Sequence, residues 1–173
     1  MHLLLHPFHR FAHQRVDDVV SAHRATLLIL GLGNPMRGDD GFGSRVLEEL
    51  GKQALPAATQ LLDAGTAGLE IVLELMDRES VLIVDTARFG GSPGEVRRFD
   101  LWRCELPRVE WNAGHAHGLA AAVELSKALG VCPRHLNLYA VEPLDTSEVE
   151  RLSAPVERAV PVVVAQVLED LRR

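Results

Sequence analysis

Cysteine is scarce in this sequence: Cys104 and Cys132 are the only two among 173 residues. They stand far apart, in no spacing that is typical of a metal or redox site. Two isolated cysteines are typical of free thiols in a reducing compartment, and a disulfide between them is the less favoured alternative. We therefore expect a cytoplasmic protein.

Long apolar runs and an excess of positive charge are also missing. No apolar stretch approaches the ~20 residues that a helix needs to cross a bilayer, so we expect no membrane partner. The net charge is −6 with histidine neutral, and the arginines are scattered or form short pairs such as Arg97 and Arg98. Because phosphate contacts require a concentrated basic surface, this charge argues against a nucleic-acid partner.

The first 25 residues differ from the rest, because they hold five of the eight histidines. Their apolar run, Leu3–Leu5, is shorter than the ~7–15-residue core of a signal peptide. We expect residues 1–25 to be a poorly ordered His-rich extension, with a metal-sequestering arm as the alternative. Residues 26–173 are long enough to form a single α/β domain with a sizeable core.

Apolar runs and helical spacings alternate along this domain. Continuous or alternating apolar runs predict strands, and apolar residues three or four apart predict helices. The predicted strands are 26–32, 59–63, 80–85, 95–101 and 135–141, and the predicted helices are 42–50, 69–76, 115–129 and 148–171. Pro161 is expected to kink or split the last helix. This alternation predicts a three-layer, doubly wound, mostly parallel five-stranded sheet, with helices on both faces and 95–101 as an antiparallel edge strand.

The glycine-rich loop Gly31–Gly43 resembles a nucleotide cradle but lacks its parts. Met36 stands where a dinucleotide fingerprint requires its third glycine, and no Gly-Lys-Ser/Thr element occurs. Asp39 and Asp40 would repel a phosphate at the start of the following helix, which one of them is expected to cap. The loop therefore favours a cation over a phosphate.

Three carboxylates follow predicted parallel strands, and such strand ends meet at one edge of the sheet. Asp40 and Asp85 supply two oxygens, although Asp85 alone would fit equally well as a residue that caps the next turn. His115 and His117, at the start of a predicted helix, supply a nitrogen. Two oxygens and one imidazole with open positions suit zinc, nickel or another transition metal. Asp63 either holds a ligand in place or forms an Asx turn.

For other polar and aromatic residues, the sequence leaves both a functional and a structural role open. Glu142 lines the same crevice or, the favoured interpretation, is a solvated turn carboxylate. Trp102 and Trp111 form an apolar wall for a partner or pack beneath a loop. Ser44 lies in no Gly-x-Ser-x-Gly elbow, so a serine nucleophile is poorly supported.

Four segments together resemble the hydrogenase maturation protease family, whose members remove a short C-terminal extension from the large subunit of nickel-iron hydrogenases. They are Leu30–Gly43, Leu62–Gly68, Leu82–Ala87 and His115–Leu119. The last helix also looks like the C-terminal helix of the family. The resemblance runs from about Thr26 to the end and leaves the His-rich start unexplained.

The resemblance implies a metal-binding triad formed by Asp40, Asp85 and His115. Many relatives carry glutamate where Asp40 stands. His115 is preferred because the family pattern reads His-x-x-Gly-Leu and Gly118 lies three residues further on; His117 stays an alternative. The resemblance further implies that nickel, carried by the hydrogenase large-subunit precursor, is the recognition element of a metal-dependent endopeptidase. A metal-polarised carbonyl or metal-activated water would then serve hydrolysis, with a carboxylate as general base.

Two other functions compete with this prediction. Gly31–Pro35 also resembles the opening of peptidyl-tRNA hydrolases, but the Thr-Arg-His-Asn element of that family is missing. A nickel-binding maturation chaperone that does not cut its client is the second alternative, and the His-rich extension favours it.

Overall fold

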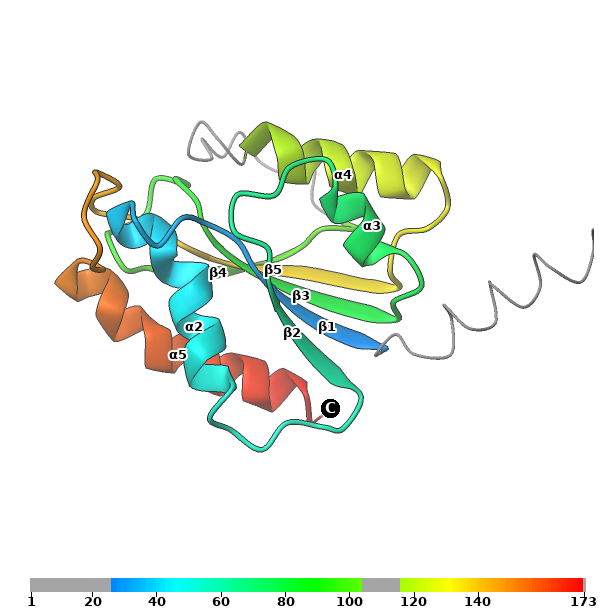
Figure 1. Ribbon diagram of the computed structural model, residues 1–173, viewed down its shortest axis with the longest axis horizontal. Helices are drawn as coiled ribbons and strands as arrows, with labels where there is room; N and C mark the ends of the chain where they lie inside the picture. The colour runs from blue at the N-terminus through cyan, green and yellow to red at the C-terminus, as the bar shows by residue number, and fades with distance from the viewer. Residues whose placement is uncertain (1–25, 104–115, 173) are drawn as a thin grey trace, which may run out of the picture.

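The computed structural model describes residues 26–103 and 116–172, in which a five-stranded sheet lies between two layers of helices (Figure 1). The strands are β1 (Leu27–Gly31), β2 (Thr59–Asp63), β3 (Ser80–Thr86), β4 (Val96–Asp100) and β5 (His135–Val141), in the spatial order β2-β1-β3-β5-β4. All neighbouring strands are parallel except β4, which pairs antiparallel with β5 at one edge. The predicted sheet, including its antiparallel edge strand, is confirmed.

Alternate residues of each central strand are buried on opposite faces of the sheet. In β3, Val81 and Ile83 pack into one apolar core, whereas Leu82 and Val84 pack into the other. Successive side chains of a strand point to opposite faces, so a strand that is covered on both sides is apolar throughout. This explains why the run 80–84 carries no polar residue after Ser80.

Helices form the outer layers (Figure 1). One face is covered by α2 (Phe42–Leu50) and α5 (Ala154–Asp170), and the other by α3 (Ile71–Leu75) and α4 (Ala116–Ala128). The prediction of helices on both faces is confirmed. None of the helices in the described ranges is long and apolar enough to cross a membrane.

The last helix begins later than predicted and is not split. Residues 148–153 precede it in an irregular loop, Ser153 is its N-cap residue, and Pro155 lies in its first turn, a position that proline favours. Pro161 lies within the single helix and is exposed. The carbonyl of Glu157, which loses its usual donor there, belongs to an equally exposed residue, so water can satisfy it.

The start of α2 also differs from the prediction. A short 3-10 turn, η1 (Gly38–Gly41), precedes the helix, and no side chain forms a capping hydrogen bond at either start. Asp39 and Asp40 therefore do not cap α2. Both carboxylates are buried and are used elsewhere.

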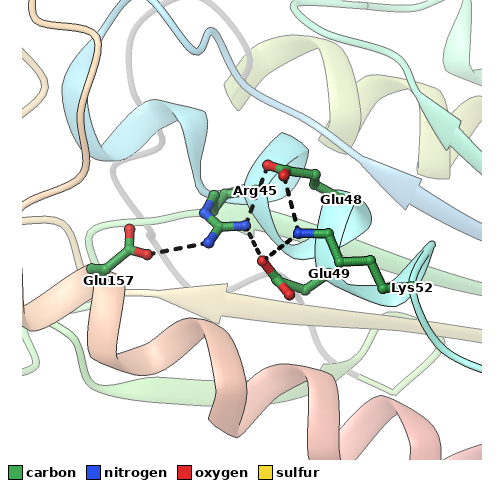
Figure 2. Close-up of polar contacts among 5 residues, drawn as sticks. All are labelled: Arg45, Glu48, Glu49, Lys52 and Glu157. Atoms are coloured by element: carbon green, nitrogen blue, oxygen red, sulfur yellow. Dashed lines mark hydrogen bonds and ion pairs between the residues drawn. The ribbon is translucent and has the colours of Figure 1, made fainter.

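Arg45, in the first half of α2, connects this helix to the start of α5 (Figure 2). Its guanidinium contacts Glu48 and Glu49 of its own helix and lies 3.5 Å from the carboxylate of Glu157 in α5. The hydrogen bond with Glu49 is the main cause of the raised pKa of Arg45. Because these side chains are partly exposed, the pairs contribute little to the stability of the fold.

Candidate active site

The chain changes direction across the sheet between β1 and β3. From β1 it passes through α2 to β2 on one side, whereas from β3 it continues to β4 and β5 on the other. Crevices form beyond the carboxyl ends of strands at such a switch point. Asp40 follows β1 and Asp85 is the penultimate residue of β3, so the predicted carboxylates flank this point.

Glycines let the loop after β1 lie directly against both strand ends. A Cβ atom on Gly43 would stand 2.3 Å from the carbonyl oxygen of Leu32 and 2.8 Å from that of Val84. Gly33 has a φ of +120°, and a Cβ there would overlap the carbonyl oxygen of Asp40 at 1.8 Å. The glycines thus serve a close backbone approach that fixes Asp40, which is the physical reason for the resemblance to a nucleotide loop.

Asp40 is buried at the switch point, with 3% of its surface exposed. One carboxylate oxygen accepts a hydrogen bond from the backbone N–H of Asn34 at 3.0 Å, and the other accepts one from the hydroxyl of Thr86 at 3.3 Å. Because Thr86 directly follows Asp85, this contact joins the loop after β1 to the end of β3.

Asp85 has a buried carboxylate oxygen that finds no partner within the described part of the chain. The residue is 1% exposed, and its Oδ1 accepts the backbone N–H of Thr86 at 2.7 Å. Its Oδ2 has no hydrogen-bond partner among the described residues. The pKa of Asp85 is raised to about 8: burial is the main cause, the Thr86 N–H offsets part of the rise, and the nearby charge of Asp40 adds to it. Such an oxygen fits a cation, which would replace the proton.

The alternation of β3 assigns Asp85 to one side of the sheet. Val81, Ile83 and Ala87 all pack against α3 and α4, and Asp85 shares their parity in the chain. The helix α4 covers this same side of the sheet, so Asp85 faces the layer in which α4 begins.

Asp39 has a role that the sequence analysis did not foresee. Its fully buried carboxylate accepts the backbone N–H groups of Leu144, Asp145 and Ser153 at 2.6–2.9 Å and the hydroxyl of Ser153 at 2.9 Å. Asp39 thus fastens the loop between β5 and α5 to the loop after β1. The doubled acid was the available signal, but its partners lie more than 100 residues away in sequence and no local pattern reveals them.

The other predicted polar residues have structural roles. Asp63 is exposed and accepts the backbone N–H of Gly65 at 3.0 Å, as an Asx turn does. Glu142 is buried rather than solvated, so the favoured interpretation was wrong. Its Oε2 accepts the backbone N–H groups of Phe89 and Gly91 at 2.8 and 3.0 Å. Glu142 therefore holds the loop after β3 against the end of β5.

The aromatic candidates are only partly described. Trp102 donates its indole N–H to the carbonyl of Pro133 at 2.6 Å and stands beside Lys127, which supports the packing alternative. Trp111 lies outside the described residues. So does Cys104, whereas Cys132 is a free thiol.

His115 lies outside the described residues, and His117 is in the first turn of α4 with an undescribed side chain. Within 26–103 and 116–172, no three potential ligand side chains meet. Of the three predicted ligands, the structure brings together Asp40 and Asp85, whose charges interact. The start of α4 is nevertheless well placed. It lies at the carboxyl edge of the sheet (Figure 1), and a Cβ on Gly118 would stand 2.6 Å from the Cα of Gly68. This contact fixes the helix next to the loop after β2.

The fold and the carboxylates define a doubly wound α/β protein with two buried carboxylates, Asp40 and Asp85, at its switch point. A model of the hydrogenase maturation protease family matches residues 44–170, about three quarters of the sequence. The chain therefore belongs to the hydrogenase maturation protease family.

Individual relatives agree with this assignment. The hydrogenase expression/formation protein HupD of Bradyrhizobium diazoefficiens is 34% identical over 128 residues, which cover 70% of this chain and 65% of that protein, just under two thirds of its length. The hydrogenase maturating endopeptidase HybD from E. coli is similar in structure, with a TM-score of 0.70, 27% identity, and coverage of 84% of this chain and 91% of that one. The hydrogenase 2 maturation peptidase from a Thaumarchaeota archaeon has a TM-score of 0.64, 31% identity, and coverage of 84% and 97%.

Proposed function

We propose that the protein is an endopeptidase that removes the C-terminal extension of a nickel-iron hydrogenase large-subunit precursor once nickel has been inserted. Asp40, Asp85 and His115 are the residues that recognise this nickel. The family assignment supports the reaction. The buried Oδ2 of Asp85, which lacks a partner among the described residues and lies close to Asp40, is the observation that supports the metal recognition.

Nickel enters this proposal as part of the substrate. Two carboxylates and an imidazole leave coordination positions open, which the ligands of the precursor would fill. A precursor without nickel offers the buried carboxylates no cation and gains no binding energy from them. Cleavage therefore waits until the metal is in place.

Hydrolysis requires an activated water and a polarised peptide carbonyl. The oxygen of water bonds to the carbonyl carbon, the C–N bond breaks, and a proton is transferred to the departing amine. The nickel of the substrate polarises the carbonyl or the water. A carboxylate of the site, Asp40 or Asp85, accepts a proton from the water and returns it to the departing amine.

The test is incubation of the purified chain with nickel-loaded and nickel-free precursor, followed by mass spectrometry of the large subunit. We expect loss of the extension from the loaded precursor alone. Cleavage of both forms would refute metal recognition, and cleavage of neither would refute the peptidase. His115→Ala should abolish cleavage and His117→Ala should leave it close to wild type; the reverse result would assign the ligand to His117.

The same experiment separates the peptidase from a nickel-binding chaperone, which the histidines of residues 1–25 favour. Tight uptake of nickel by the isolated chain, lost on removal of residues 1–25 and without cleavage of any precursor, would support the chaperone. Full cleavage by a chain that lacks these residues supports the peptidase.

Gly118→Ala tests whether the start of α4 positions a ligand. The new methyl group collides with the backbone of Gly68, so the helix start must move. A displacement of about 1 Å costs on the order of a hundredfold in rate, whereas the stability should fall by only about 1–3 kcal/mol. The measurement is the cleavage rate together with the Tm.

Gly130→Ala is the matched control for this variant. Gly130 lies beyond the other end of α4 with a φ of +70°, and its Cβ would meet nothing within 4 Å. Alanine there costs about 1 kcal/mol of stability through its backbone strain but leaves the helix start in place. Equal cleavage rates for the two variants would contradict the positioning role of Gly118.

A further inference from the structure

Four large apolar side chains stand exposed in loops at the carboxyl edge of the sheet, the edge that also holds the buried carboxylates. We call Met36, Leu69, Leu144 and Val149, whose exposed fractions lie between 37% and 54%, the apolar rim. They come from three loops, those that follow β1, β2 and β5. Scattered exposed apolar residues are ordinary; what distinguishes these four is that their loops meet at one site.

The loops of the apolar rim are fastened to one another by backbone contacts. The N–H of Gly38 donates to the carbonyl of Val149 at 2.6 Å, and that of Asp39 donates to the carbonyl of Asp145 at 2.8 Å. On the other side, the N–H of Gly33 donates to the carbonyl of Gly65 at 2.8 Å. The apolar rim is thus presented on a fixed backbone, and docking against it costs little loop entropy.

The carboxylates at the centre determine which partner fits. Asp40 and Asp85 are almost completely buried, and carboxylates out of water favour a cation that comes to them with a docked surface. A second copy of this chain would bring the same net charge of −6, which disfavours its approach to a negatively charged centre. A protein whose own surface carries a metal satisfies both the charge at the centre and the apolar surround.

We propose that the apolar rim docks the face of the hydrogenase large-subunit precursor that surrounds its nickel. This proposal rests on the proposed function and adds the surface through which the precursor is held. None of the four side chains is a proposed nickel ligand, and none is proposed to contact the peptide bond that is cut. They contribute to association with the precursor and leave the chemical step unchanged.

Charged substitutions on the apolar rim test the proposal. Met36→Asp and Leu144→Asp each place a carboxylate on the docking surface without removing any hydrogen bond that the backbone forms. With the full chain and nickel-loaded precursor, we expect each to raise KM at least about tenfold, with kcat unchanged. Leu129→Asp is the matched control, because Leu129 is 59% exposed and lies beyond the far end of α4. Its KM should equal that of the wild type, and all three variants should keep the wild-type Tm.

Unchanged KM values for Met36→Asp and Leu144→Asp would overturn the proposal. So would a wild-type dimer in sedimentation velocity that Met36→Asp dissociates without a change in KM, since the rim would then contact a second copy. If the wild-type chain cuts no precursor, the proposed function fails separately. In that case titration calorimetry measures the Kd for binding of the chain to the nickel-loaded precursor. A Kd that Leu144→Asp raises about tenfold or more supports the docking surface, and equal Kd values for this variant and the wild type overturn it.

Discussion

Asp85→Asn is expected to abolish processing of the nickel-loaded precursor while it stabilises the metal-free protein at alkaline pH. Asparagine keeps the shape of the side chain and can still accept the N–H of Thr86, so the fold should survive. It has no negative charge to offer a cation and cannot accept a proton from water. Both proposed contributions of Asp85 are therefore lost together.

The stability effect follows from the sign of the pKa shift of Asp85. The folded protein holds this proton up to a pKa of about 8, whereas the unfolded chain releases it near pH 4. Because the folded state binds more protons between these values, the stability of the wild type falls as pH rises through this window. Asparagine does not titrate, so the variant avoids a loss on the order of a few kcal/mol.

The measurement is the Tm of the metal-free proteins between about pH 4 and pH 9. The advantage of Asp85→Asn should grow across this range and level off above pH 8. In the control Asp100→Asn, at the half-buried end of β4, Asp85 is still present, so this variant should follow the pH dependence of the wild type. A constant Tm difference would refute the buried titration of Asp85, and wild-type processing by Asp85→Asn would refute its functional role.

Asp39→Ala is expected to destabilise the fold strongly, whereas Asp40→Asn at the adjacent position is expected to leave the fold intact. The truncation removes the acceptor of the backbone N–H groups of Leu144, Asp145 and Ser153. Each donor that is left unsatisfied in a buried site costs about 1–3 kcal/mol. A total loss of about 3–5 kcal/mol lowers the Tm of a domain of this size by roughly 10 °C.

Asp40→Asn provides the matched comparison, because it changes the adjacent residue and keeps an acceptor for Asn34 or Thr86. Its Tm should stay within a few degrees of the wild type, while processing is lost. Asp39→Asn retains one acceptor oxygen and should fall between Asp39→Ala and the wild type. Equal Tm values for Asp39→Ala and the wild type would show that the loop between β5 and α5 does not depend on this carboxylate.

The sequence predicts most of the fold because the central strands are buried on both faces. The runs 27–30 and 80–84 have no solvated face, and such runs are readily recognised. The alternation in 96–100 likewise indicates an edge strand. The start of α5 is the main error. Residues 148–153 have helical spacing, but hydrogen bonds between Asp39 and residues of the preceding loop hold them in another conformation.

The site is predictable in part. Strand ends locate Asp40 and Asp85 at one edge, and the missing third glycine excludes a phosphate cradle. The different fates of Asp39 and Asp40 could not be predicted, because each depends on partners that are distant in sequence. Glu142 was misjudged for the same reason: its donors belong to the loop after β3. The contribution of His115 stays a prediction.

The contacts of Asp39 also determine when, during synthesis of the chain, the loop that holds Asp40 can form. Its carboxylate bonds to residues 105 to 114 positions further along the chain. A nascent chain that has not yet emerged past Ser153 lacks these partners, however early β1 was synthesised. Contacts of such long sequence separation form late and slowly. The loop that holds Asp40 is therefore completed only after Ser153 has emerged, so a shorter nascent chain presents no finished site to any precursor.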